Sequence, residues 1–175
     1  MTTIAMASYS LPPQNIPSVQ ELGYELKIWK PSFTDWKPNG FPRKYYIYSF
    51  FHFLKIFRNR NYCAVFVMDG NIIASSMLLI PSYFKWPFMK KNDLQFCFSI
   101  TKMKYRGQGI NTSCKADLMR IISKKNQNIG FWGILSNQNI SSKRVLAKLG
   151  LKEIAQAYRT KKLFSLITVL EIEEC

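Results

Sequence analysis

The sequence predicts one mixed α/β domain, and three observations predict that class. Its 175 residues suit a single domain, because domains typically hold roughly 100–200 residues. The composition, 47% hydrophobic and 20% charged, supports a buried core and argues against disorder. Segments with the period of a strand and segments with the period of a helix alternate along the chain. No long apolar run or basic amino-terminal leader occurs, so we expect neither a membrane-spanning helix nor a signal peptide.

The first third of the chain is predicted to hold an arm, a strand and a helix. Residues 1–20 contain three prolines and are expected to form an irregular arm, with the domain itself spanning residues 21–175. Residues 24–29 alternate between apolar and polar and predict a strand. Residues 43–58 lack glycine and proline and predict a helix, although their many aromatics would also suit a strand.

A hairpin and an alternation of helices and strands are predicted for the rest. Asp69 and Gly70 separate two apolar runs, which indicates a tight turn because glycine accepts a positive φ. Gly150 follows a helical segment at the position typical of a helix C-cap. The predicted strands are 61–68, 72–80, 93–101, 129–135, 151–158 and 161–170, and the predicted helices are 108–126 and 139–149.

The charge and the cysteines indicate which kinds of ligand the protein could bind. The chain has 25 Lys and Arg against 10 Asp and Glu, a net charge of +15, which favours anionic partners. Alternatively, the lysines reflect a genome with AT-rich codons, and the positive charge then has no functional role. Cys63, Cys97, Cys114 and Cys175 form no CxxC pair and the chain has one histidine, so we expect no metal site. Reduced thiols in a cytoplasmic protein are the simplest interpretation of these cysteines.

The segment from Tyr105 to Asn111 (YRGQGIN) lies between a predicted strand and a predicted helix. Gly107 and Gly109 allow a tight turn there. The first N–H groups of the following helix are then unpaired at the positive end of its dipole, which suits a pyrophosphate. The patterns GxxxxGK[ST] and GxGxxG are absent, so the segment is neither a P-loop nor a dinucleotide fingerprint.

Two motifs resemble the GNAT superfamily of acyl-CoA-dependent N-acyltransferases. Its motif A, [Q/R]-x-x-G-x-[G/A], is matched by Arg106 and Gly109, whereas Asn111 departs from the usual Gly or Ala. Residues 139–151 (NISSKRVLAKLGL) are similar to its second motif, an Asn followed by a helix that ends in Leu-Gly-Phe, with Leu151 in place of Phe. The order of predicted elements also matches this superfamily.

The resemblance implies a twisted, mostly antiparallel sheet of about seven strands, splayed between residues 93–101 and 129–135. The thioester of acetyl-CoA or another short acyl-CoA would lie in the gap, polarised by backbone N–H groups and attacked directly by an amine. The residues implied to contact CoA are Ser99, Ile100, Thr101, Arg106, Gly107, Gln108, Gly109, Ile110, Asn111, Thr112, Asn139 and Ser142. Helix capping is an equal alternative for Asn139 and Ser142.

The sequence does not identify a single acid for the leaving thiolate or a single base for the attacking amine. Many members have a Tyr that protonates the leaving thiolate, and Leu146 stands at that position, so another group, such as Tyr158, or solvent would supply the proton. The amine needs a base near neutral pH, and the catalytic candidates are His52 and Asp93. The structural alternatives are aromatic packing for His52 and a strand-end role for Asp93.

A narrower resemblance suggests the acceptor. Residues 81–95 and 130–132 are similar to sugar-nucleotide N-acyltransferases of bacterial surface-polysaccharide (lipopolysaccharide O-antigen) biosynthesis, which acylate nucleotide-linked amino-deoxy sugars. Aromatic side chains would stack the base and lysines would meet the phosphates. The implied substrate-binding residues are Tyr83, Phe84, Lys85, Trp86 and Gln95. The same loop would alternatively pack on the domain or on the second subunit of a homodimer.

Other functions stay open. Another small amine or a protein amine would suit the same chemistry, but cationic acceptors favour an acidic cleft and the chain has only ten carboxylates. A non-enzymatic nucleic-acid-binding domain would explain the charge and leave both motifs unexplained, so we expect no nucleic-acid partner. Residues 45–57 would lie on a membrane surface only if they were apolar on one face. They are apolar all round, so we expect burial and no stable membrane anchoring.

Overall fold

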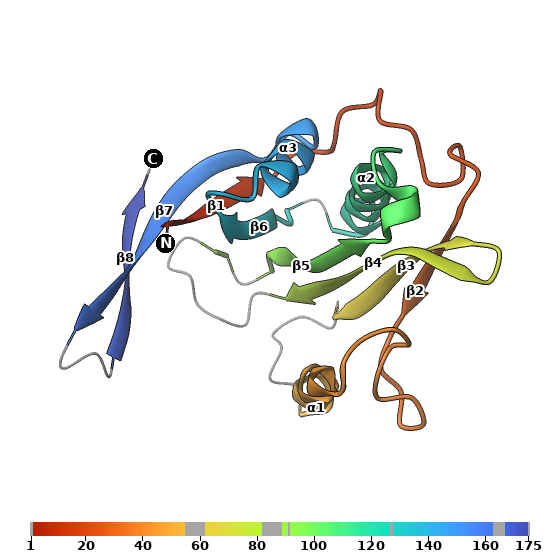
Figure 1. The fold of residues 1–175 in the computed structure, drawn as a ribbon, viewed down its shortest axis with the longest axis horizontal. Coiled ribbons are helices and arrows are strands. Elements are labelled where there is room, and N and C mark those ends of the chain that lie inside the picture. The colour runs from red at the N-terminus through yellow and green to blue at the C-terminus, as the bar shows by residue number, and fades with distance from the viewer. Residues whose placement is uncertain are drawn as a thin grey trace.

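The computed structural model describes residues 2–54, 62–81, 89–90, 92–126, 128–162 and 167–174 (Figure 1). The strands in these residues are β1 (Thr2–Ser8), β2 (Glu25–Trp29), β3 (Cys63–Asp69), β4 (Ile72–Pro81), β5 (Leu94–Thr101), β6 (Phe131–Ser136), β7 (Lys152–Lys162) and β8 (Ile167–Glu174). The helices are α1 (Tyr46–Phe53), α2 (Ile110–Ser123) and α3 (Ile140–Lys148), with short 3₁₀ segments η1 (Arg43–Tyr45) and η2 (Met103–Tyr105).

The strands of the described residues form one sheet in the order β2-β3-β4-β5-β6-β1-β7-β8. Neighbouring strands are antiparallel except for β5 and β6, which are parallel. The predicted α/β class and the mostly antiparallel sheet are therefore confirmed. The turn between β3 and β4 has the predicted geometry, with Gly70 at a φ of 56°.

The expectation that residues 1–20 form an irregular arm is wrong for their first part. Strand β1 lies in the middle of the sheet, paired with β6 on one side and β7 on the other. Four of its side chains in a row, those of Ile4, Ala5, Met6 and Ala7, are buried. A strand buried on both faces has no alternation of apolar and polar residues, so its period does not identify it. This strand brings the total from seven to eight.

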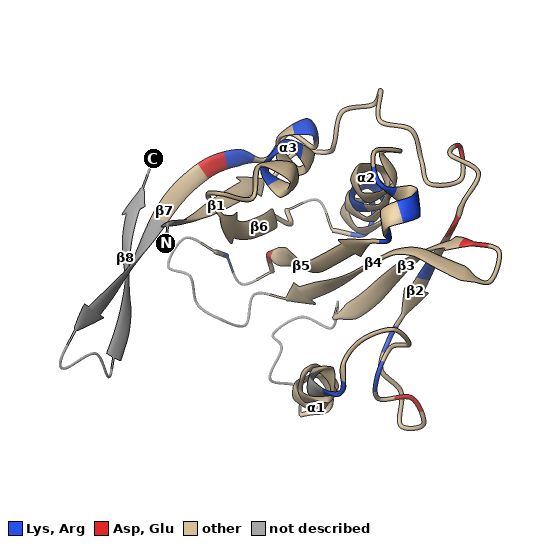
Figure 2. Cartoon of the chain, in the orientation of Figure 1, with Lys and Arg blue, Asp and Glu red and all other residues tan. Residues whose placement is uncertain are grey.

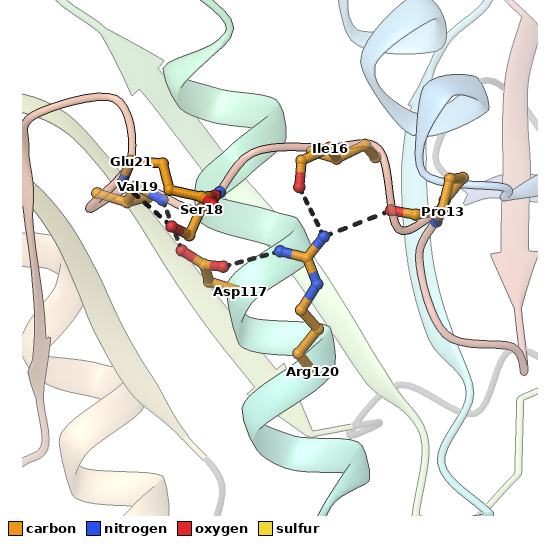
Figure 3. A network of polar contacts seen from close by, with 7 residues as sticks. All are labelled: Pro13, Ile16, Ser18, Val19, Glu21, Asp117 and Arg120. Carbon is orange, nitrogen blue, oxygen red and sulfur yellow. Dashed lines mark hydrogen bonds and ion pairs between the residues drawn. The ribbon is translucent and has the colours of Figure 1, made fainter.

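The rest of the arm lies along α2, where a polar network holds it (Figure 3). The Asp117 carboxylate accepts hydrogen bonds from the Val19 backbone N–H at 2.8 Å and from Arg120 at 3.1 Å. The Arg120 guanidinium also donates to the carbonyl oxygens of Ile16, at 2.7 Å, and Pro13, at 3.4 Å. These contacts hold in place a proline-containing segment that forms no helix or strand of its own.

The helices cover the sheet on both faces, with α2 and α3 on one face and α1 on the other (Figure 1). Leu118 of α2 and Leu146 of α3 pack into the same core cluster as Met77 of β4. On the opposite face, Tyr45, the N-cap of α1, packs in a second cluster with Phe66 of β3. The apolar residues on both faces of the central strands are buried by these helices, which stabilises the sheet.

Helix α1 is shorter than the predicted helix over residues 43–58. It ends at Phe53, and residues 55–61 lie outside the described residues. Ser49 is buried and donates a hydrogen bond to the Trp36 carbonyl oxygen at 2.6 Å. Tyr46 and Phe50 are nearly half exposed, so the burial expected for this apolar segment is wrong for these two residues. Within the described part of the chain, none of the helices has the length and apolar character needed to cross a bilayer.

Candidate active site

A cleft opens where β5 and β6 separate. The register of these two parallel strands covers three positions, from Leu94 opposite Phe131 to Phe96 opposite Gly133. Because β5 continues to Thr101 beyond this pairing, the strands are joined at their first residues and apart at their last. The sheet is therefore splayed between the two strands that the sequence resemblance indicated.

A β-bulge in β5 lies at the point of separation. Phe98 and Ser99 together face the single residue Met77 of β4, and Phe98 has a φ of 52°. A bulge leaves one residue unpaired and disrupts the ladder of hydrogen bonds, so it frees backbone groups of β5 for a ligand. The Phe98 ring reaches the Tyr45 ring, with a distance of 5.1 Å between the centroids. The bulge thus connects the cleft to the face of the sheet that carries α1.

The cleft has a volume of about 230 Å³ and is bounded by β5, β6, α2 and α3. Its lining combines apolar side chains with polar ones, and most of these residues are neutral. The lining residues are Phe96, Phe98, Ser99, Asn111, Lys115, Gly133, Ile134, Leu135, Asn139, Ser142, Val145 and Leu146. Of the residues expected to contact CoA, the structure brings Ser99, Asn111, Asn139 and Ser142 together in this lining.

The amino-terminal end of α2 follows β5 through η2 and a turn with two glycines. Gly107 and Gly109 have φ values of 80° and 78°, in the left-handed region, and no atom would obstruct a Cβ at either position. Glycine is therefore required there by backbone conformation. The carbonyl oxygen of Gly109 accepts hydrogen bonds from Thr112 at 2.9 Å and Ser113 at 3.0 Å, which begins the helix.

Side chains brace this turn. The Arg106 Nε donates to the Thr101 carbonyl oxygen at 3.1 Å. The Gln108 side chain accepts from the Tyr24 hydroxyl at 2.6 Å and donates to the Lys104 carbonyl oxygen at 3.2 Å. Since these side chains hold the turn, the unpaired backbone N–H groups at the start of α2 are its available donors for an anion.

Helix α3 begins with the capping interaction that the sequence left as an alternative. Asn139 is the N-cap, and its Oδ1 accepts a hydrogen bond from the Ser142 backbone N–H at 3.1 Å. Capping does not remove either residue from the cleft, because both line it. The Asn139 side chain thus fixes the start of the helix that forms one wall.

Leu146 lines the cleft from α3. Its side chain is buried and lies so close to β6 that a Cβ added at Gly133 would be 2.2 Å from the Leu146 Cδ1. Glycine at position 133 therefore gives this leucine its space. An apolar side chain occupies the place where the resemblance implies a tyrosine hydroxyl, so this wall supplies no proton.

The structure favours a structural role for Asp93 over a catalytic one. The residue is fully buried beside the first residue of β5. Its Oδ2 accepts hydrogen bonds from the Tyr9 hydroxyl, the Trp132 Nε1 and the Lys90 backbone N–H, each at 2.8 Å. Its Oδ1 accepts from the Gly130 backbone N–H at 2.9 Å. Four donors occupy a carboxylate that has about four acceptor positions. Asp93 therefore ties β5, β6 and the arm together, and does not line the cleft.

His52 is on the other side of the sheet from α2 and α3. It lies on α1, and its ring centroid is 5.7 Å from that of Phe53 and 6.0 Å from that of Tyr62. It is absent from the cleft lining. The aromatic surroundings match the structural alternative of the sequence analysis, and we do not assign His52 the role of base.

The predicted acceptor site is only partly described. Tyr83, Phe84, Lys85 and Trp86 lie outside the described residues. Gln95 is partly buried and pairs with Trp132 in the closed part of the β5–β6 pair, so it is outside the cleft lining. Ile100 and Thr101, predicted to contact CoA, are also outside that lining. They lie in the last part of β5, and Ile100 is 60% exposed.

The sequence analysis missed Lys115, which is the only titratable residue in the cleft lining within the described part of the chain. It lies on α2 one turn beyond Asn111 and is only 3% exposed. Its Nζ donates to the Ser99 Oγ at 2.9 Å and to the Asn111 Oδ1, and lies 5.7 Å from the centre of the Phe96 ring. Burial lowers the pKa of Lys115 to about 8. Its place on the inner face of an amphipathic helix was the available signal.

The helices around the cleft are basic. Figure 2 shows Lys and Arg on α2, on α3 and in the segment that joins β5 to α2. This distribution favours an anion at the open end of the cleft. Among the residues that the structure describes, no three His, Cys, Asp or Glu side chains form a group that could hold a metal ion.

Comparisons with known proteins connect this geometry to a fold. No family model and no curated protein matches the sequence. A tandem GNAT protein from the clavulanic acid biosynthesis pathway, without acetyl-CoA, is 12% identical with a TM-score of 0.56, over 99% of this chain and 53% of its own. The GCN5-related glucosamine N-acetyltransferase region of a fungal multi-domain GH3 β-N-acetylglucosaminidase is 10% identical with a TM-score of 0.52, over 89% of this chain and 20% of its own.

The chain has the GNAT fold. L-PGS from Bacillus licheniformis is a third neighbour, 12% identical with a TM-score of 0.51 over 93% of this chain and 61% of its own. The chain thus spans between 20% and 61% of the length of these three proteins. At such low identities the likeness concerns the fold, and activity must be argued from the site.

Proposed function

We propose that the protein is an acyl-CoA-dependent N-acyltransferase that moves an acetyl or other short acyl group onto an amine. The observation that carries the proposal is the position of the glycine turn relative to the splayed strands. Strand β5 pairs with β6 at its first residues and leads from its last residue, through η2, to the turn. The anion-binding end of α2 thus follows the open end of the cleft. A long thioester with a pyrophosphate at one end suits such a site.

The cleft residues suit the arm of CoA. A volume of about 230 Å³ is below the roughly 300–1,000 Å³ of pockets that enclose a drug-sized ligand, so it suits an extended chain. The residues proposed to contact that chain are Ser99, Asn139 and Ser142, with the backbone N–H groups of residues 99–101 next to the acyl carbonyl. Preorganised donors of this kind stabilise the oxyanion that develops when an amine attacks a thioester.

For the acceptor we propose the amino group of a nucleotide-linked amino-deoxy sugar. The sequence of residues 83–86 supports this proposal, because aromatics can stack a base and a lysine can contact phosphates. The fungal neighbour described as a glucosamine N-acetyltransferase region supports an amino sugar within the same fold. Another small amine or a protein amine is the competing acceptor, and it would use the same CoA site.

We propose that the reaction takes place in the cytoplasm. Cys63, Cys97 and Cys114 are free thiols in the structure, and free thiols are typical of a reducing compartment. Burial raises the pKa of each of these thiols to about 12, so they are not reactive thiolates near neutral pH. None of the three is therefore proposed as a covalent acyl carrier, in keeping with direct attack by the amine.

Thermal unfolding with acetyl-CoA, free CoA and a panel of nucleotide-linked amino sugars tests the proposal. A ligand that binds only the folded protein stabilises it by about 2.7 kcal/mol at 100 times its dissociation constant. Stabilisation by CoA and by one nucleotide sugar would support both parts. Stabilisation by CoA alone would keep the chemistry and reject the sugar. The absence of any effect of CoA would reject acyl transfer and favour a nucleic-acid-binding domain, with binding that weakens steeply as salt rises.

A further inference from the structure

Lys115 has no function in the proposed site as described so far. Its burial in the cleft is unusual, because a lysine is almost never fully buried unless it is paired with a charge. The residue is 3% exposed, and none of the ion pairs among the described residues includes it. Its two hydrogen-bond acceptors, Ser99 and Asn111, are neutral. Burial of an ammonium without a counter-charge destabilises a fold, which suggests that this lysine is kept for function.

The proposed reaction creates a negative charge in the same cleft. When an amine attacks the acyl carbon, a C–N bond forms, the C–S bond breaks, and the electron pair of that bond leaves with the sulfur. The thiolate needs a proton, and the attacking nitrogen must lose one. Leu146 is apolar, and Ser142 and Asn139 are poor acids at neutral pH. Among the described residues that line the cleft, Lys115 is the only titratable one.

We propose that the Lys115 ammonium, held by Ser99 and Asn111 against the β5 bulge, stabilises the CoA thiolate as it leaves and donates a proton to it. This assignment rests on the proposed function. The neutral amine of Lys115 then regains a proton that the attacking nitrogen releases into the water of the open cleft. The sum is an amide and a free thiol from a thioester and an amine, with no proton gained or lost.

The three donors of an ammonium fit this role. Two of the Lys115 N–H groups are taken by Ser99 and Asn111, which leaves one for a ligand. Burial lowers the pKa of Lys115 to about 8, near the value of roughly 8.5 for a simple cysteine thiol. An acid and a leaving group with similar pKa values exchange a proton readily near neutral pH.

Other titratable groups around Lys115 do not compete for the proton. The Cys97 thiol of β5 and the neighbouring Cys114 thiol of α2 are the groups that interact with it electrostatically. Burial raises the pKa of both to about 12, so both stay neutral over the range in which Lys115 titrates. The charge that Lys115 would meet in the cleft is therefore that of the ligand.

The test measures the titration of the thiol of bound CoA by the ultraviolet absorbance of its thiolate, which requires no acceptor. A cation within about 4–6 Å lowers the pKa of an acid by about 1–3 units. We expect the thiol of CoA bound to the wild type to titrate at least about one unit lower than the thiol of CoA bound to Lys115→Met. Lys125→Met, which removes an exposed lysine just beyond the end of α2, should match the wild type. Lys115→Gln replaces Lys115→Met if the latter does not fold.

The outcomes separate this assignment from the proposed function. If wild type and Lys115→Met bind CoA and its thiol titrates equally in both, the role of Lys115 is overturned and acyl transfer stands. If neither protein binds CoA, the proposed function fails and the assignment fails with it. Mass spectrometry after incubation with acetyl-CoA tests whether Lys115 itself becomes acylated. If an acyl group forms rapidly on Lys115 and then passes to an acceptor, Lys115 is a nucleophile and its role as acid is overturned.

Discussion

Replacement of Lys115 by Met should stabilise the protein, and the gain should depend on pH. Burial lowers the pKa of Lys115 from 10.5 to about 8 in the folded protein. At 1.36 kcal/mol per pKa unit, keeping this residue charged in the fold costs about 3 kcal/mol of unfolding free energy. The loss of the hydrogen bonds to Ser99 and Asn111 offsets about 1 kcal/mol of this gain.

The pH dependence follows from proton binding in the two states. Between pH 8 and 10.5 the unfolded chain holds the Lys115 proton while the folded chain has lost it, so the stability of the wild type rises with pH in that window. Below pH 8 both states are protonated and the full penalty applies. The Met variant lacks this dependence. We therefore expect it to be more stable by about 2 kcal/mol below pH 8 and to lose that advantage by pH 10.5.

Urea unfolding of wild type, Lys115→Met and Lys125→Met at several pH values measures these differences. The titration of all other groups cancels when the variant is subtracted from the wild type, provided that the m-values agree. The Lys125→Met variant should follow the wild type across the range. A stability difference for Lys115→Met that stays constant from pH 8 to 10.5 would refute the reasoning, because it would show that the buried lysine has an ordinary pKa.

Substitutions of Asp93, Gly109 and Gly133 test the rest of the account, with Gly23→Ala and Leu146→Ala as matched changes. Asp93→Asn should lower the unfolding free energy by about 2 kcal/mol in urea unfolding, because an amide nitrogen would face one of the donors that the carboxylate now accepts. Gly109→Ala should cost about 1 kcal/mol for its φ of 78° and weaken CoA binding in calorimetry, whereas Gly23→Ala, with a φ of 82°, should cost as much and leave CoA binding unchanged. Gly133→Ala should destabilise by about 1–3 kcal/mol, and Leu146→Ala in the same chain should relieve the clash and give a favourable coupling energy.

Local signals in the sequence predicted most of the sheet and both helices beside the cleft. Asp-Gly fixed the β3–β4 hairpin because only a few residues adopt positive φ there, and Gly150, with a φ of 83°, follows α3 as a C-cap glycine does. The turn with Gly107 and Gly109 was identified for the same reason. Such features depend on the backbone of a few consecutive residues, so the sequence alone contains the information.

Features that depend on distant contacts were missed. Strand β1 is defined by its neighbours β6 and β7, and its small buried residues show no period of their own. Asp93 was a candidate base because it begins the strand expected beside the thioester. Its structural role was not visible, since its four donors come from separate parts of the chain, from Tyr9 to Trp132. Lys115 was not singled out, because its place on an amphipathic helix is only a weak signal and the packing of α2 on β5 is what buries it in the cleft.

The most direct test of the central claim is backbone amide NMR of the protein titrated with CoA. If CoA lies in the cleft between β5 and β6, the largest shifts should fall on the turn at residues 107–111, on the β5 bulge at residues 98–101 and at the start of α3. The amides of β2 and α1, on other parts of the sheet, should move little. Saturable shifts confined to surfaces outside the cleft, or the absence of shifts with CoA, would contradict the account.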